Sequence, residues 1–443
     1  MSHYKPYPAY KDSGVEWLGR VPEHWYVVRM RYAATLNPPV RRDLLDDPDQ
    51  EVSFLPMEAI GEDGSLNLEQ NRPVADVRNG YSYFEDGDVA FAKVTPCFEN
   101  GKGALMRGLR CAAGFGTTEL TVLRPNLAVA DARYINYIVQ GSSFRAFGAG
   151  AMTGAGGLKR VPDEFTRNFP VLLPELGEQR VIASTLDRET ARIDALIEKK
   201  TRFIELLREK RQALITHAVT KGLDPNAKMK DSGVEWLGEV PEHWGVRSFK
   251  HLAGIRYGIG EPPAYKAEGT PLIRATNVDA GCIRSEGLVY VDPADIPDKR
   301  IIWLAPGDII VVRSGAYTGD SAIVQEHHCP AIAGFDMVVS PKCVNPFFLQ
   351  YALLSRYLKS NQIDLEKMRA AQPHLNAEEL GSCFVLLPPP IEQESIVAFL
   401  DHSTKRVDGV ISKTLLSIDL LKERRSALIT AAVNGQIDLR ETV

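Results

Sequence analysis

The chain has 443 residues, of which 44% are hydrophobic and 25% charged, and its formal net charge is −5. This composition is ordinary for a globular protein of two or three domains. The sequence contains no run of eighteen apolar residues that would predict a membrane span, and its first residues lack the apolar core of a signal peptide. We therefore expect a cytoplasmic protein. The six cysteines form no C-x-x-C pair, which argues against a disulfide framework or a zinc site, and the net charge gives no hint of nucleic acid, although a basic face can lie on an acidic body.

A segment near the N-terminus, residues 11–25, returns almost unchanged at residues 230–244. It reads K-D-S-G-V-E-W-L-G-R-V-P-E-H-W, and fourteen of its fifteen positions are identical, the exception being Arg20 against Glu239. So close a repeat indicates an anchor that packs against a surface present twice. We interpret its tryptophans as core residues: Trp17, Trp25, Trp236 and Trp244. Contact with a partner subunit, once per half, is the alternative interpretation.

Between the first anchor and residue 171 the chain has the pattern of a mixed α/β module. Short apolar runs bounded by turn residues predict strands at residues 52–57, 88–94 and 120–123. Residues 132–140 predict a helix, because their apolar side chains recur on one side. A glycine-rich stretch at residues 148–160 follows, and it predicts a loop.

Residues 244–385 repeat the order of these elements with little sequence identity. The counterparts of two strands, the helix and the glycine-rich loop are residues 271–277, 307–315, 346–354 and 368–375. The frame, meaning the repeated anchors, the long helices and the order of the elements between them, is therefore copied closely, while the sequences of the elements between the anchors and the helices have diverged. That contrast is typical of a protein that recognises two different ligands.

The longest feature is a helical segment that also occurs twice. Residues 171–219 align with residues 385–433 without a gap, and 25 of the 49 positions are identical. Apolar residues recur at seven-residue steps in the first copy, with a second stripe beside them: Leu186, Ile193, Leu207 and Leu214, then Ile182, Leu196 and Phe203. About 40 residues at 1.5 Å each give a rod of roughly 60 Å. Because such a rod cannot bury its stripe alone, we expect the two copies to pack as an antiparallel coiled coil.

Three stretches are similar to chemical motifs, and none matches in full. N-P-P-V at residues 37–40 is similar to the N-P-P-aromatic motif of adenine methyltransferases, but Val40 replaces the aromatic residue and no turn for S-adenosylmethionine precedes it. The glycine-rich stretch lacks the Lys and hydroxyl pair of a phosphate-binding loop. His327, His328 and Cys329 are adjacent and point in alternating directions, which suits one metal badly. The sequence therefore shows no catalytic centre.

Polar side chains recur at matching places in both halves, after one predicted strand and in the stretch before the long helix. Arg, Lys, Asn and Gln read base edges in the major groove, and Lys and Arg neutralise phosphates. We therefore predict a DNA-contacting surface in each half. Its candidate residues are Lys93, Thr95, Asn100, Lys102, Lys159 and Arg160 in the first half, and Arg313, Ser314, Tyr317, Thr318, Arg369, Gln372 and His374 in the second.

The ordered duplication resembles the specificity subunit of type I restriction-modification systems. Three motifs carry the resemblance, each present twice: D-S-G-V-E-W-L-G-x-V-P-E-H-W, V-L-L-P followed by E-Q, and A-L-I-T-x-A-V. The resemblance implies an α/β fold with target-recognition domains at residues 1–170 and 227–384. It also implies two helical spacers, at residues 171–226 and 385–443, that form an antiparallel coiled coil.

In that family each recognition domain reads one half of an asymmetric, interrupted double-stranded DNA site, and the helices set the unread spacer. The resemblance implies no catalysis and no cofactor in this chain. Two modification subunits would supply methylation with S-adenosylmethionine, and restriction subunits would use ATP and Mg²⁺ for translocation and cleavage. We expect modification subunits to dock partly on charged helix faces, including Lys199, Lys200, Arg208 and Lys210. The alternatives are a single-chain enzyme with its own methyltransferase or nuclease centre, and a bivalent scaffold that binds proteins.

Overall fold

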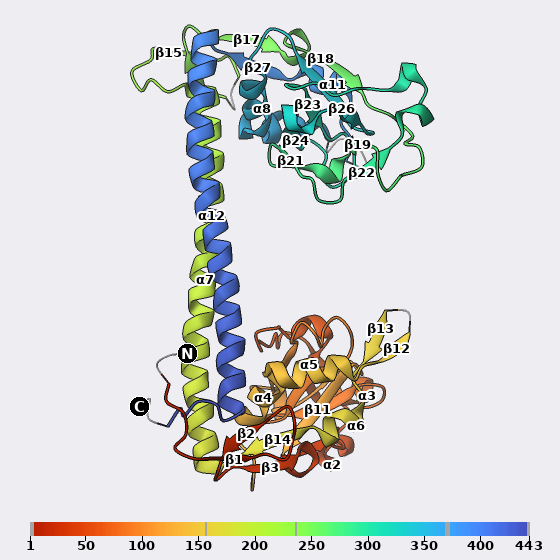
Figure 1. Ribbon diagram of the computed structural model, residues 1–443, viewed down its shortest axis with the longest axis vertical. Coiled ribbons are helices and arrows are strands. Elements are labelled where there is room, and N and C mark those ends of the chain that lie inside the picture. The colour runs from red at the N-terminus through yellow and green to blue at the C-terminus, as the bar shows by residue number, and fades with distance from the viewer. Residues whose placement is uncertain (1–3, 156, 235–236, 368–372, 441–443) are drawn as a thin grey trace. The chain divides into compact units, whose positions relative to one another are not determined.

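The computed structural model describes residues 4–155, 157–234, 237–367 and 373–440 (Figure 1). The chain divides into two compact units, unit 1 with Met1–Lys200 and Leu416–Val443, and unit 2 with Thr201–Leu415. Each unit contains one α/β module and part of both long helices, α7 (Leu176–Lys221) and α12 (Pro390–Val433). The predicted mixed α/β fold with two long helices is confirmed. Among the described helices, none is both long and apolar enough to cross a membrane.

The module of unit 1 is built on two four-stranded sheets, β6-β5-β10-β7 and β4-β11-β8-β9. The pairing of β5 with β10 is parallel, and the other pairings are antiparallel. The strands are β4 (Ala34–Leu36), β5 (Glu51–Leu55), β6 (Asn71–Pro73), β7 (Ser82–Glu85), β8 (Val89–Ala92), β9 (Gly103–Leu105), β10 (Ala113–Gly116) and β11 (Leu120–Pro125). Two-stranded sheets join β1 (Tyr10–Asp12) to β2 (Arg20–Pro22) and β3 (Tyr26–Arg29) to β14 (Pro170–Leu173).

The module of unit 2 repeats this topology with fewer strands. Its sheets have the orders β18-β26-β23-β24 and β22-β19-β25, and the pairing of β19 with β25 is again parallel. The strands are β18 (Ala253–Tyr257), β19 (Thr270–Ile273), β22 (Val289–Val291), β23 (Ile309–Val311), β24 (Ser321–Ile323), β25 (Ile332–Ala333) and β26 (Met337–Pro341). Two-stranded sheets join β15 (Met229–Asp231) to β16 (Glu239–Pro241) and β17 (Gly245–Ser248) to β27 (Phe384–Leu387).

The central strand β8 is apolar on both faces because each face lies against a different core. Val89 and Phe91 pack into one buried cluster, whereas Ala90 and Ala92 pack into another. Side chains alternate along a strand, so a continuous apolar run is what a strand between two cores requires. The counterpart β23 follows the same rule, with alternate residues in two clusters of unit 2.

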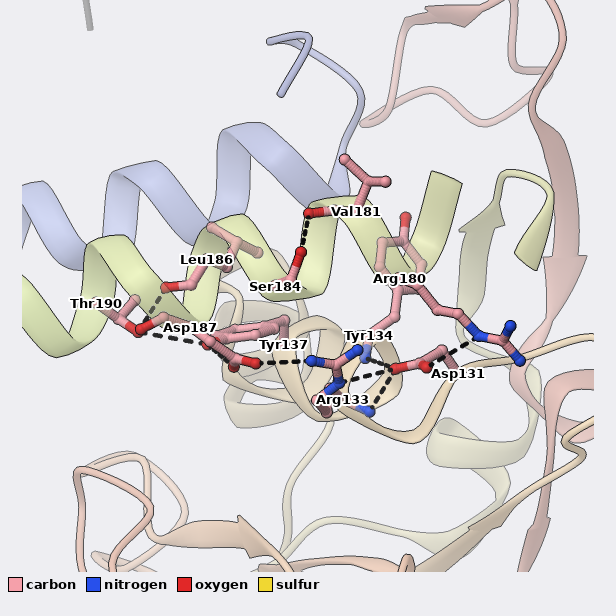
Figure 2. Close-up of polar contacts among 10 residues, drawn as sticks. All are labelled: Asp131, Arg133, Tyr134, Tyr137, Arg180, Val181, Ser184, Leu186, Asp187 and Thr190. Carbon is pink, nitrogen blue, oxygen red and sulfur yellow. Dashed lines mark hydrogen bonds and ion pairs between the residues drawn. The ribbon is translucent and has the colours of Figure 1, made fainter. Parts of the chain in front are cut away.

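Helix α4 (Ala132–Gln140) holds the first module against α7. Asp131 caps its N-terminus by accepting hydrogen bonds from the backbone N–H groups of Arg133 and Tyr134. The hydroxyl of Tyr137 donates to Asp187 of α7 over 2.7 Å and lies 3.3 Å from the hydroxyl of Thr190 (Figure 2). In unit 2, helix α8 (Pro346–Leu354) is capped by Asn345, and its Tyr351 meets Asp401 and Thr404 of α12 in the same way.

The repeated motifs of the sequence contact one another in each unit. The indole N–H of Trp25 donates to Glu178 over 3.1 Å, and His24 Nε2 lies 2.8 Å from the same carboxylate. Trp244 and His243 make the same contacts, over the same distances, with Glu392. Trp25 and Trp244 are fully buried, so they are core residues as interpreted, and Trp17 is half-buried beside Phe147 and Phe169. Trp236 lies outside the described residues.

A buried glutamine follows each of these glutamates and bonds the helix to its module. Gln179 accepts a hydrogen bond from the backbone N–H of Asp131 over 2.9 Å and donates to the carbonyls of Val129 and Pro174. Gln393 accepts from the backbone N–H of Asn345 and donates to Pro388, both over 2.8 Å. The E-Q pair at the start of each helix is therefore the point where helix and module are joined.

The two long helices run antiparallel. In unit 1 Arg425 Nε lies 3.0 Å from Asp194 Oδ1, and in unit 2 Arg211 Nε lies 3.0 Å from Asp408 Oδ1. Ile182, Leu186 and Ile193 are buried as predicted, but Leu196 and Phe203 are exposed. Ile182 is buried because it packs with Leu186 into the cluster that the first module forms with both long helices, whereas Leu196 and Phe203, farther along the same stripe as Ile182, are not part of that cluster.

The glycine-rich stretch at 148–160 is not the predicted loop. Its first residues end helix α5 (Ser142–Gly150), and the rest form a hairpin of β12 (Thr153–Ala155) and β13 (Leu158–Arg160). Position 148 of this helix requires glycine, because a Cβ there would lie 2.4 Å from the ring of Phe98. Gly154 has a φ of +143°, which side chains rarely adopt and which the hairpin needs. These glycines permit close packing and a tight hairpin.

We predict that Gln179→Leu destabilises unit 1, because it leaves the N–H of Asp131 and two carbonyls without their partner. The expected loss of unfolding free energy is on the order of 3 kcal/mol. Thermal and urea unfolding of the purified chain would measure it. Gln70→Leu is the control, since that glutamine is exposed, and equal unfolding of the two variants would contradict the assigned role.

Candidate nucleic-acid interface

The β12–β13 hairpin is an exposed part of the first module. Every described residue of its two strands is exposed, and the hairpin extends beyond the sheets (Figure 1). Two backbone hydrogen bonds join its base to the end of β8, from Thr95 N to Lys159 O over 3.0 Å and from Val161 N to Lys93 O over 2.8 Å. The structure therefore brings four candidates together, namely Lys93, Thr95, Lys159 and Arg160.

Thr95 fastens this hairpin with its side chain as well. Its hydroxyl donates to the carbonyl of Gly157 and accepts from the backbone N–H of Lys159, both over 2.9 Å. The hydroxyl is thus used inside the chain. Thr95 is a positioning residue, and Lys159 is the side chain that it presents to solvent.

Arg160 is paired with Glu119, a residue that the sequence did not single out. Arg160 Nε lies 2.9 Å from Oε2, and Arg160 Nη2 lies 2.5 Å from Oε1. This hydrogen bonding holds the pKa of the Glu119 carboxyl below its usual value. Glu119 immediately precedes β11, and its carbonyl accepts from Lys93 N over 2.8 Å. That backbone pairing between neighbouring strands explains why residues so far apart in the sequence meet.

The other two candidates of the first module lie apart from this group. Lys102 donates its ammonium group to the carbonyl of Met57 over 3.1 Å, so this charge is used within the module. Asn100 is exposed, and its backbone N–H donates to the carbonyl of Pro96. Residue type alone does not reveal which polar side chain bonds within the module and which one is exposed to solvent.

The second module places Arg313 where the first has Lys93. The backbone N–H of Leu375 donates to Arg313 O over 2.8 Å, as that of Val161 does to Lys93 O. The guanidinium stacks 3.4 Å from the ring centroid of Phe335, and its buried Nε has no hydrogen-bond partner among the residues that the structure describes. Arginine stacked on an aromatic face is held in one orientation.

Asp336 is the counterpart of Glu119, because each directly precedes the equivalent strand. Its Oδ1 accepts from the backbone N–H of Arg313 over 3.2 Å. Burial raises the pKa of this carboxyl. Sequence reasoning missed both acids, since neither has a motif around it.

The remaining candidates of the second module have different environments. Ser314 and His374 pair through an antiparallel bridge, as Val94 and Arg160 do in the first module, and line one hollow together. Tyr317 is exposed. Thr318 is buried and donates to the carbonyl of Gly315 over 2.7 Å, so it holds the loop. Arg369 and Gln372 lie outside the described residues.

These contacts define one equivalent surface in each module, which we call the reading surface. In the first module it consists of Lys93, Glu119 and Arg160, and in the second of Arg313, Asp336 and His374. The backbone positions correspond, but the side chains differ in charge and shape. In the first module Glu119 pairs with the guanidinium of Arg160. In the second module Asp336 accepts from the backbone N–H of Arg313, whose guanidinium stacks on Phe335. Arginine, lysine and histidine side chains on such a surface are of the types that contact base edges and phosphates.

Comparison with known proteins places this architecture in a family. A family described as "Type I restriction modification DNA specificity domain" matches residues 261–415. The chain is 34% identical to the EcoAI type I restriction enzyme specificity subunit of Escherichia coli, over 97% of this chain and 85% of that protein. The chain belongs to the type I restriction enzyme specificity subunits. The EcoEI specificity subunit of E. coli is 37% identical over an aligned stretch of 186 residues, which covers 42% of this chain and 31% of that protein.

Solved structures share the fold of this specificity subunit. One comes from work on complex assembly and conformational transition of the type I R-M system, with a TM-score of 0.73 at 20% identity, and covers 94% of this chain and 99% of that one. The HsdS subunit from Thermoanaerobacter tengcongensis has a TM-score of 0.51 at 19% identity, over 94% and 98% of the two chains.

The N-P-P-V segment of this specificity subunit is a structural turn. The side-chain oxygen of Asn37 accepts from Val122 N over 3.0 Å, and its amide donates to Asp163 over 3.2 Å. Those bonds engage both ends of the amide that a methyltransferase would direct to a base. Among the described residues, no three His, Cys, Asp or Glu side chains gather as a metal site requires.

We predict that Thr95→Val loosens the hairpin without unfolding the module. Losing the two hydroxyl bonds lowers the free energy of local opening by about 1–2 kcal/mol, so trypsin should cleave after Lys159 or Arg160 about 5- to 30-fold faster. Limited proteolysis with mass spectrometry would measure the rate. Thr118→Val, at an exposed position nearby, is the control, and equal cleavage of both variants would show that Thr95 does not fasten the hairpin.

Proposed function

We propose that this chain is the DNA-reading subunit of a type I restriction-modification complex, in which each module reads one half of an asymmetric, interrupted site. The observation that carries the proposal is the pair of reading surfaces. The same backbone hydrogen bond, from Val161 N to Lys93 O and from Leu375 N to Arg313 O, and the same bridge position hold both surfaces, whereas Lys93 and Arg160 are replaced by Arg313 and His374. Two different readers on one frame suit a site with two different halves.

The long helices set the length of the unread spacer in this proposal. Each module bonds to the start of one helix through the E-Q pair and to the end of the other helix. Ser142 N donates to Thr430 Oγ1 over 2.9 Å in unit 1, and Arg356 N donates to Thr216 Oγ1 over 3.1 Å in unit 2. Each module is thereby fixed to both helices, so helix length controls the distance between the two base contacts.

The chain assembles, we propose, with two modification subunits and with restriction subunits. Apolar side chains are exposed at matching positions of the two helices, Leu196 with Val410 and Leu206 with Leu420. Charged residues lie beside them on α7, of which Lys199, Arg208 and Lys210 are exposed and Lys200 is half-buried. Apolar patches rimmed by charges mark protein interfaces, and their duplication suits two identical partners.

Catalysis belongs to the partners in this proposal. S-adenosylmethionine, ATP and Mg²⁺ would bind the modification and restriction subunits, and this chain would carry no cofactor. The deciding experiment is co-expression with the cognate modification subunit, followed by mapping of methylated adenines across a genome. We expect one bipartite motif that disappears when this chain is omitted. Methyl transfer by the purified chain alone would show that the chain is the rival single-chain enzyme. If the chain showed no salt-sensitive binding to a bipartite DNA duplex, the result would favour a scaffold that binds proteins.

We predict that inserting one heptad at matching positions of α7 and α12 lengthens the spacer and leaves both half-sites unchanged. Seven residues add about 10 Å of helix, which is about three base pairs of duplex, and a whole heptad keeps the apolar seam in place. Methylation mapping gives both quantities at once. Changed half-sites at an unchanged spacer would contradict the role of the helices, and a heptad of the same composition inserted after residue 440 serves as the control.

A further inference from the structure

The hydrogen bonds of Arg160 leave one particular edge of its guanidinium open. Glu119 binds the side edge, with Nε 2.9 Å from Oε2 and Nη2 2.5 Å from Oε1. A guanidinium is planar and carries five N–H groups. The side edge uses one N–H of Nε and one of Nη2, so the end edge, formed by Nη1 and the second N–H of Nη2, still has its parallel pair of donors. Within the described part of the chain, Glu119 is the one carboxylate paired with Arg160.

The position of Arg160 allows that edge to reach a partner. Arg160 ends β13 at the base of an exposed two-stranded ribbon. The major groove of B-DNA admits a two-stranded ribbon. Two neighbours on the same strand, Leu158 and Lys159, are also exposed. An apolar side chain suits a thymine methyl group and a lysine suits a phosphate.

We infer that Arg160 reads a guanine in the half-site of the first module, with its end edge donating to O6 and N7, and that Glu119 is the positioning residue that holds the fork in this orientation. The inference rests on the proposed function. O6 and N7 of guanine are two acceptors in one plane, and they match two parallel donors. Fixing the side chain in advance lowers the entropy that binding must remove.

A surface salt bridge with no further role is the competing explanation, and it makes a different prediction. Such exposed pairs contribute little to stability, so either explanation allows Arg160→Ala to fold. They differ in whether one base position of the recognised site depends on Arg160. Arg110→Ala is a matched control, because Arg110 lies in the same module and forms an exposed pair with Glu51, 2.8 Å apart.

The test is methylation mapping with the complete complex, carrying the wild-type chain, Arg160→Ala, Glu119→Gln or Arg110→Ala. We expect Arg160→Ala to relax a single guanine of the first half-site, with a roughly 5- to 150-fold loss of discrimination at that position. Glu119→Gln should relax the same position less, since the arginine is present but no longer held. The second half-site and the spacer should be unchanged in both, and Arg110→Ala should match the wild type.

Four results would overturn the inference: an unchanged motif with Arg160→Ala, uniformly weaker methylation without relaxation, relaxation in the second half-site, or the same relaxation with Arg110→Ala. A first half-site without guanine on either strand would do so as well. Failure of the proposed function is seen separately, because the wild-type chain would then direct no bipartite motif at all.

Discussion

The structure depends on the junction where each helix leaves its module. A carboxylate in the first turn of a helix is stabilised by the helix dipole, and Glu178 uses that position to accept the indole N–H of the buried Trp25. A buried indole needs such a partner. Gln179, fully buried, satisfies three backbone groups of the module at the next residue. Two consecutive side chains therefore fix the direction of a 46-residue helix relative to its module, and Glu392 and Gln393 repeat the junction.

This junction explains why two modules can differ without disturbing the frame. The frame uses side-chain hydrogen bonds from residues that are the same in both copies, such as Tyr137 and Tyr351 to matching Asp residues of the helices. An unsatisfied buried polar group costs about 1–3 kcal/mol, so these positions tolerate little change. The reading surfaces lie at strand ends, away from those bonds, and their exposed side chains, such as Arg160 and His374, can change without leaving a buried partner unsatisfied.

Sequence alone predicted the frame well, because its repeats are motifs that contact each other. The interpretation of Trp25 and Trp244 as core residues and the pairing of the helices both followed from the repetition. The contacts among the candidate DNA-contacting residues were predicted only in part. Glu119 has no motif and meets Arg160 only because β8 and β11 are neighbours in the sheet. Lys102 and Thr318 turn inward to carbonyl groups, and residue type does not reveal which partner a polar side chain finds.

Backbone hydrogen bonds attach the reading surface to the end of the equivalent strand in both modules. Val161 N to Lys93 O and Leu375 N to Arg313 O are backbone bonds of the same length, 2.8 Å, although the four side chains differ between the modules. A backbone hydrogen bond excludes proline at the position that donates the N–H, and it places no other restriction on the side chains of the two residues. The chain can therefore hold the end of a strand at a fixed place while its side chain varies. These two backbone bonds are the same in both modules, so under the proposed function a different base preference requires no new fold.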